Sequence, residues 1–162
     1  MLETDSLASV RPATRDLITF QVGGQDFCID AHRVREIRGW TPETRLPASP
    51  PYVRGVINLR GTILPIVDLA LRLGMTAIDC DARPAVIVVS SGSRLVGLLV
   101  DMVCDIVEVS EDDLQPTPET GCSIVASLAP HLATIGDRVA GLLAAERILP
   151  EMGEAVDPAR SR

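Results

Sequence analysis

Aromatic side chains are scarce in this chain and make up only 2% of its 162 residues. They are Phe20, Phe27, Trp40 and Tyr52. Pockets that bind small molecules are usually lined by apolar and aromatic side chains around a few converging polar groups, so this scarcity argues against a ligand-binding β-barrel. Hydrophobic residues still make up 46% of the chain, and they must therefore be mostly aliphatic. Valine and isoleucine favour pleated sheets, which indicates a β-rich core.

The chain also lacks the residue patterns of catalytic and metal sites. No two cysteines have the CxxC spacing, and the only histidines are His32 and His131. No serine lies in a GxSxG elbow, and Gly23-Gly24 falls between strands, where a hairpin needs glycine. We therefore expect no catalysis, no cofactor and no metal. We expect the cysteines to be small structural residues in a reducing compartment. They are Cys28, Cys80, Cys104 and Cys122.

An excess of basic residues is absent as well. The chain has 15 Lys and Arg residues against 22 Asp and Glu residues, for a net charge of −7 and a pI near 4.8. This balance disfavours nucleic acids and anionic lipid as partners, because both bind clustered positive charge. No apolar run approaches the length of a membrane helix, and the first thirty residues show no signal peptide. We expect a cytoplasmic protein whose partners are other proteins.

The length suits a single domain. Residues 1–14 and 153–162 are polar and aperiodic, as flexible tails are, so 15–152 should form the folded part. Within it, apolar side chains recur at period two, which is typical of strands. The segments with this pattern are 18–22, 27–29, 34–37, 53–60, 63–67, 84–89, 95–100, 103–109, 124–128 and 132–144. Nine or ten short strands at this spacing predict an all-β barrel or sandwich.

Helix signals are few. Asp68 can cap a short helix over 69–73, which Gly74 can end. A second short helix is expected over 145–152. Pro65 restricts its strand to an edge or a bulge, because proline cannot donate to a ladder.

Two linked motifs lie in the segment Val34–Leu73. Asn58-Leu59-Arg60-Gly61 ends an apolar strand, and Pro65-Ile66-Val67-Asp68-Leu69 follows it closely. The segments 94–110 and 136–139 continue the pattern in the same order. In these motifs the chain closely resembles CheW-type chemotaxis coupling proteins, and the resemblance covers roughly residues 15–150.

The resemblance implies a fold of two intertwined five-stranded SH3-like β-barrels joined around a hydrophobic seam. It also implies a non-catalytic scaffold in bacterial chemotaxis signal transduction. Such a scaffold couples the cytoplasmic tip of methyl-accepting chemoreceptors to the regulatory domain of a CheA-type histidine kinase. The protein would be cytoplasmic, recruited to membrane-associated receptor arrays without membrane insertion, and monomeric in isolation. A CheW-type scaffold of another kinase pathway, such as surface motility or development, remains an alternative.

The resemblance places a receptor-binding groove between the barrels. By this likeness its residues are Val34, Glu36, Gly55, Asn58, Arg60 and Gly61. Arg60 could extend its guanidinium onto a carboxylate of the receptor. Gly55 and Gly61 could let a partner helix approach the backbone closely. Alternatively, Arg60 could pair internally with Glu36 and only brace the groove.

The kinase-binding residues are harder to assign. The hairpin over 84–101 is expected to expose an aliphatic edge that extends the barrel of the kinase. Its candidate residues are Val86, Val88, Leu98 and Val100. The loop 113–120 could make a second contact. Family members often carry a basic residue and an aromatic residue there, at the places held here by Gln115 and Thr120.

Overall fold

The computed structural model describes residues 13–91, 93–118 and 123–148, and strands dominate this part of the chain. The strands form two sheets. The six-stranded sheet contains β1 (Thr14–Val22), β2 (Gln25–Asp30), β8 (Met102–Ser110), β9 (Leu114–Pro116), β10 (His131–Ile135) and β11 (Arg138–Leu142). The five-stranded sheet contains β3 (Val34–Gly39), β4 (Val53–Leu59), β5 (Thr62–Asp68), β6 (Ala85–Ser91) and β7 (Arg94–Val100). The predicted all-β class is therefore confirmed.

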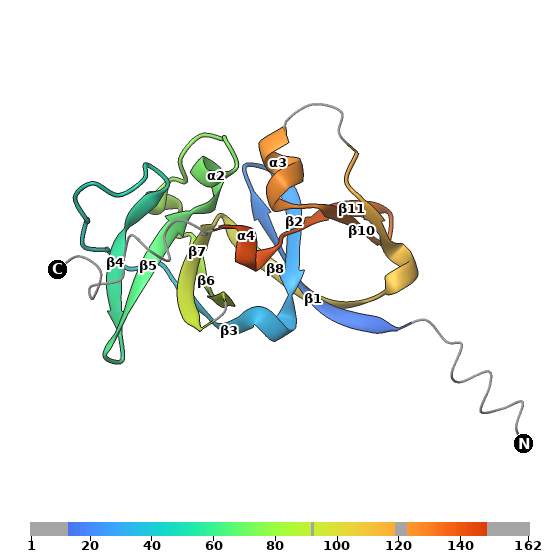
Figure 1. The fold of residues 1–162 in the computed structure, drawn as a ribbon, viewed down its shortest axis with the longest axis horizontal. Coiled ribbons are helices and arrows are strands. Elements are labelled where there is room, and N and C mark those ends of the chain that lie inside the picture. Colours follow the sequence, from blue (N-terminus) through green and yellow to red (C-terminus); the bar gives the residue numbers. More distant parts are fainter. Residues whose placement is uncertain (1–12, 92, 119–122, 149–162) are drawn as a thin grey trace, which may run out of the picture.

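The chain crosses between the two sheets twice (Figure 1). It leaves the six-stranded sheet after β2, builds the whole five-stranded sheet, and returns with β8. The strand order is β8-β1-β2-β11-β10-β9 in the first sheet and β3-β6-β7-β5-β4 in the second. This interleaving is the arrangement expected of two intertwined SH3-like barrels. The first sheet has one strand more than expected, the three-residue β9.

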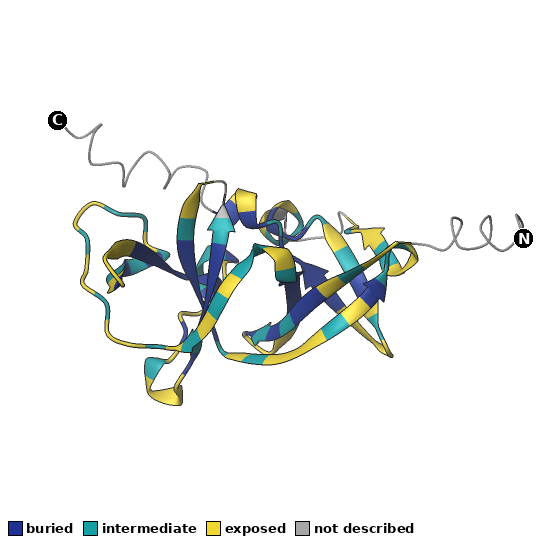
Figure 2. Cartoon of the chain, turned by 90° about the horizontal axis from the view of Figure 1, so that it is seen from below, coloured by how far each residue is buried: buried dark blue, intermediate teal, exposed yellow. Residues whose placement is uncertain are grey.

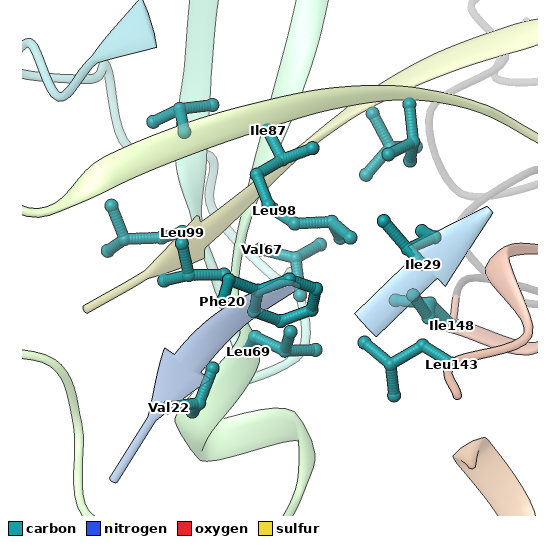
Figure 3. Packing of buried hydrophobic residues seen from close by; sticks show 14 of the residues in the cluster. Phe20, Val22, Ile29, Val67, Leu69, Ile87, Leu98, Leu99, Leu143 and Ile148 are labelled. Carbon is teal, nitrogen blue, oxygen red and sulfur yellow. The ribbon is translucent and has the colours of Figure 1, made fainter. Parts of the chain in front are cut away.

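The main hydrophobic core lies where the two sheets meet. Phe20 and Ile29 of the six-stranded sheet belong to the same buried cluster as Ile87 and Leu98 of the five-stranded sheet (Figure 3). Figure 2 shows buried residues gathered in the middle of the molecule and exposed residues on the outer strands and loops. A smaller cluster within the six-stranded sheet contains Leu17, Cys28, Val109, Ala133, Ala140 and Leu142. Because the larger core draws on both sheets, neither sheet can bury its apolar residues alone.

Pro65 is tolerated inside the five-stranded sheet by a gap in its pairing. Strand β5 lies between β4 and β7, yet β7 pairs with it only from Ile66 to Asp68. Pro65 pairs with Val56 of β4 and has no partner on its other side in the described ladder. Pro65 therefore faces a locally unpaired edge on the β7 side, and the β4–β5 pairing shifts register nearby, between Val53 and Gly55, which agrees with the predicted edge or bulge.

Two predicted helices match the structure as far as it is described. The helix expected over 69–73 is α2 (Leu69–Arg72). The helix expected over 145–152 begins as α4 (Ala145–Ile148), and the remainder lies outside the described residues. Three single turns of 3-10 helix are η1 (Ala31–Arg33), η2 (Cys80–Ala82) and η3 (Glu111–Asp113).

The strand predicted over 124–128 is wrong, because these residues belong to the helix α3 (Ser123–Leu128). Five residues are too few to separate period two from period 3.6, and the alanine and leucine in this segment favour helix. The amide of Ala129 donates to the carbonyl oxygen of Val125 at 2.7 Å, which continues the helical turn. Leu128 is buried in the main core, so packing supports the helical form.

The predicted tails fall mostly outside the described residues. Residues 153–162 and 1–12 are not described, and Thr14, assigned to the N-terminal tail from the sequence, begins β1. Within the described part of the chain, no helix is long and apolar enough to cross a membrane.

Asp68 is fully buried and joins three segments. Its Oδ1 accepts the amide of Leu71 at 3.1 Å and so caps α2. Its Oδ2 accepts the amide of Ile78 at 3.0 Å, and the Nη1 atom of Arg54 lies 3.9 Å from that oxygen. A buried carboxylate is stable only when such donors surround it, so Asp68 holds α2 and the following loop against the sheet.

We expect Asp68→Ala to lower the free energy of unfolding by about 2–4 kcal/mol, because two amides would lose their acceptor in the interior. Asp79→Ala is the matched control. Asp79 also accepts a backbone amide, that of Asp81 at 3.0 Å, but it is exposed. Its loss should cost about 1 kcal/mol. Urea unfolding followed by circular dichroism measures both values, and equal losses would contradict the role given to burial.

Candidate functional site

The two-residue turn between β4 and β5 places Arg60 at the tip of a hairpin. Leu59 pairs with Thr62, and φ is positive at both intervening residues, 50° at Arg60 and 88° at Gly61. The amide of Gly61 donates to Asn58 Oδ1 at 2.8 Å. A tight hairpin turn with two positive φ values favours asparagine, aspartate or glycine, and an arginine there is strained. Strain of this kind gathers at functional sites.

Glu36 of β3 forms an ion pair with the guanidinium of Arg60 at that turn. Arg60 Nη2 donates to Glu36 Oε1, which forms an ion pair between the free edge strand β3 and the β4–β5 turn. The internal pairing of Arg60 with Glu36, which the sequence analysis gave as an alternative, is therefore present. The Arg60 side chain nevertheless stays 72% exposed, whereas that of Glu36 is only 29% exposed. We call Glu36, Asn58, Arg60 and Gly61 the Arg60 corner.

Val34 lies two residues before Glu36 at the start of β3. Val34 and Glu36 are both half-buried, but the pairing of β3 with β6 shifts register between them, so the alternation that predicted a common face is interrupted there. Val34 packs against the main core. The structure therefore places all six predicted receptor-binding residues on β3 and the β4–β5 hairpin.

Gly55 lies within β4, and the backbone that approaches it closely comes from this chain and not from a partner. It is buried with φ at 151°, and a Cβ atom there would lie 2.2 Å from the carbonyl oxygen of Thr44. Thr44 and Val56 exchange two backbone hydrogen bonds of 2.8 Å. The close backbone approach that requires glycine is thus made by the loop over residues 40–52.

That loop is anchored by polar contacts that the sequence did not predict. Trp40 Nε1 donates to Glu43 Oε2 at 2.8 Å, and Arg54 Nε donates to Glu43 Oε1 at 3.3 Å. Arg54 also reaches Asp68, so the loop is connected to the buried cap of α2. Glu43, Arg54 and Asp68 come from the loop, β4 and the end of β5, and no local pattern signals that they meet.

Arg38 is a second residue beside the corner that the sequence interpretation missed. Its Nη1 lies 3.8 Å from Glu36 Oε2, and its side chain is 31% exposed. From Glu36 to Arg38 the pairing with β6 is regular, so the period-two alternation of β3 could have identified Arg38 beside Glu36.

The predicted kinase-facing edge of the hairpin over 84–101 is wrong. Strands β6 and β7 are internal to their sheet, so neither has a free edge. The four candidates are at most 2% exposed and lie in the main core: Val86, Val88, Leu98 and Val100. The nearly continuous apolar sequence of these strands reflects burial on both faces. Gln115 is exposed on β9, and Thr120 lies outside the described residues.

The cysteines differ in their surroundings. Cys28 is fully buried, and burial raises the pKa of its thiol from the ordinary 9.0 to about 12. Burial also raises the pKa of Cys80. Cys104 lies in an apolar stretch of sequence yet is exposed, because β8 is an edge strand whose register against β1 shifts at this point. Cys122 lies outside the described residues.

The two histidines lie on different elements, η1 and β10. His32 is 88% exposed, and its Nδ1 lies 3.1 Å from Asp30 Oδ1. His131 is exposed on β10. Across 13–91, 93–118 and 123–148, no three His, Cys, Asp or Glu side chains are placed to hold a metal ion.

One pocket of about 310 Å³ lies between α3 and the strands β2 and β11. Phe27 is the aromatic residue in its wall, and the remaining apolar lining includes Val125, Leu132 and Val139. Asp26 also lines it and pairs with Arg138 at 2.6 Å. The walls present few converging polar groups of the kind that orient a small ligand.

Comparison with known proteins gives a consistent result. A family described as "CheW-like domain" matches residues 16–152. The "Probable chemotaxis protein CheW" of Rhizobium etli is 45% identical over 146 residues, covering 90% of this chain and 94% of that protein. The "Chemotaxis protein CheW" of Rhizobium meliloti is 49% identical over 136 residues, covering 84% and 88%.

The fold also matches a solved structure. The scaffolding protein TtCheW from Thermoanaerobacter tengcongensis superposes with a TM-score of 0.80 at 23% identity. The match covers 88% of this chain and 97% of that one. At this identity the similarity shows a shared fold.

We expect Gly55→Ala to destabilise the fold by about 2 kcal/mol or more, because the added methyl group would collide with Thr44 and alanine is strained at this φ. Gly39→Ala is the matched control, since nothing lies within 4 Å of a Cβ atom there. It should change stability by less than about 1 kcal/mol. Thermal unfolding measures both, and a stable Gly55→Ala variant would refute the packing argument.

The raised pKa of Cys28 predicts a loss of stability in alkali. The unfolded chain releases this proton near pH 9, whereas the folded chain holds it to about pH 12. The protonated Cys28 thiol therefore contributes its full share to the free energy of unfolding below about pH 9, and this contribution is lost as the pH rises towards 12. Urea unfolding at about pH 8 and about pH 10.5 should show a larger decrease for the native chain than for Cys28→Ala. Identical decreases would argue against a buried thiol.

Proposed function

The chain belongs to the CheW-like family of chemotaxis scaffolds, which couple chemoreceptors to the CheA kinase, and we propose that it does so without catalysing a reaction. The observation that carries the proposal is the Arg60 corner. An arginine is held at a strained turn, anchored on one side by Glu36, and left largely exposed to solvent. A charged group displayed in this way is suited to a protein partner.

The charge distribution supports a receptor contact on the five-stranded sheet. The whole chain carries −7, yet the segment 31–100 that builds this sheet has nine arginines and five carboxylates. The arginines are Arg33, Arg35, Arg38, Arg45, Arg54, Arg60, Arg72, Arg83 and Arg94. The carboxylates are Glu36, Glu43, Asp68, Asp79 and Asp81. A basic region on an acidic protein favours an acidic partner and orients its approach.

The proposed receptor surface is therefore Val34 together with the Arg60 corner. Gly55 contributes indirectly, because it lets the 40–52 loop lie close against β4. The proposed kinase contact excludes the buried hairpin over 84–101, and Gln115 on the exposed strand β9 remains a candidate. Binding to receptors would bring the protein, proposed to be a cytoplasmic monomer, to the membrane-associated arrays.

We expect Arg60→Asn to weaken binding to a receptor cytoplasmic fragment by about 1–3 kcal/mol, since the guanidinium is lost and the half-buried Glu36 loses its hydrogen-bonded partner. Asparagine accepts positive φ, so the fold should be as stable as before or slightly more so. Affinity for the kinase regulatory domain should not change. Isothermal titration against each partner measures the affinities.

Arg83→Asn is the matched control, because Arg83 is also exposed with positive φ, at 56°. It should leave both affinities unchanged. If the native protein binds neither partner, the proposed adaptor role is wrong. If Arg60→Asn binds the receptor normally, the role stands but the Arg60 corner is not its receptor site.

A further inference from the structure

Arg38 carries hydrogen-bonding capacity that the protein itself does not use. Its Nε is buried and has no hydrogen-bond partner in the described structure. Its Nη1 is 3.8 Å from Glu36 Oε2, which is too long for a hydrogen bond. An unsatisfied buried donor is costly, so the conformation seen in the isolated chain is a poor one for this guanidinium.

Two guanidiniums share a single carboxylate at this place. Arg60 forms a hydrogen-bonded ion pair with Glu36 Oε1, while Arg38 is held only weakly at the other oxygen. One positive charge is therefore left without a counter-charge next to the corner. The chain has no lysine, and the planar fork of arginine fits a carboxylate through two parallel hydrogen bonds.

The neighbouring arginines Arg54 and Arg35 do not combine a weakly paired charge with a buried donor that lacks a partner. Arg54 is engaged by Glu43 and lies close to Asp68. Arg35 is exposed at the register shift of β3 and makes no ion pair with a described residue. Arg38 is thus the residue beside Glu36 that combines a weakly compensated charge with a buried, unsatisfied donor.

We infer that Arg38 binds a carboxylate on the surface of the receptor, and that Arg60 positions it by occupying Glu36. The inference rests on the proposed receptor contact. On docking, Arg38 turns away from Glu36 and donates its Nε and Nη hydrogens to the carboxylate of the partner. Little is lost in that rotation, because the contact with Glu36 is long and the Nε is unsatisfied. Arg60 keeps Glu36 neutralised, which prevents Glu36 from recapturing Arg38.

The experiment is a titration of the receptor cytoplasmic fragment into the native protein and three variants. Arg38→Gln should weaken binding about tenfold or more, as expected for a lost charge-assisted pair, and should flatten the salt dependence. Arg38→Lys should recover only part of the affinity, because it restores the charge without the fork. Arg35→Gln, the matched control on the same strand, should change the affinity by no more than about twofold.

Thermal unfolding of the same variants separates binding from a structural role. Arg38→Gln should unfold at the same temperature as the native chain or slightly higher, since it removes an unsatisfied donor. A marked loss of stability with a parallel loss of affinity would overturn the inference, because Arg38 would then be a structural residue. Equal affinities of Arg38→Gln and Arg35→Gln would also overturn it while leaving the adaptor role intact. No binding by the native protein would overturn both.

A double variant tests the part assigned to Arg60. If Arg60 acts through Glu36, adding Glu36→Gln to Arg60→Asn removes the carboxylate that recaptures Arg38. The double variant should then bind the receptor fragment more tightly than Arg60→Asn alone. If Arg60 itself contacts the receptor, Glu36→Gln gives no recovery, and the positioning role is wrong.

Discussion

Phe20 and Ile29 from one sheet share a single hydrophobic core with Ile87 and Leu98 from the other, so neither sheet completes its own interior. Hydrophobic burial scales with the apolar area removed from water, and here the larger of the two buried clusters draws on both sheets. The interleaved chain path follows from this contact, because the chain must leave the first sheet, build the second against it, and return. The result is one folding unit with two sheets.

The shared core also decides which surfaces are available to partners. Strands β6 and β7 place their apolar side chains in the core and cannot offer an aliphatic edge. The edge strand β3 and the β4–β5 turn remain at the surface, and their polar residues meet there. Glu36 draws Arg60 across from the turn, while Arg38 stays beside it with a weaker contact. The interaction surface is therefore set by charged groups at the margin of a rigid aliphatic core.

Much of the fold was predictable from local signals. The Asp68 cap, the short helix after it and the hairpins depend on residues close together in sequence, where propensity and turn chemistry act directly. Residues 124–128 were misassigned because five residues carry too little periodic information, and packing of Leu128 selects the helix. For the site, Glu36 and Arg60 were identified through family motifs. The role of Gly55 depends on Thr44 of the preceding loop, whereas Arg38 lies two residues after Glu36 and could have been identified from the alternation along β3.

The sequence by itself determined the all-β class, the aliphatic core, the family and the Asn58–Gly61 motif, because composition, alternation and motif order are local properties. Only the tertiary structure decided which apolar strands are buried on both faces, and it removed the 84–101 hairpin from the surface. It also decided that Thr44 covers Gly55 and that two arginines share one carboxylate. These outcomes depend on which distant segments come into contact, and burial and ion pairing are properties of that contact rather than of the residues alone.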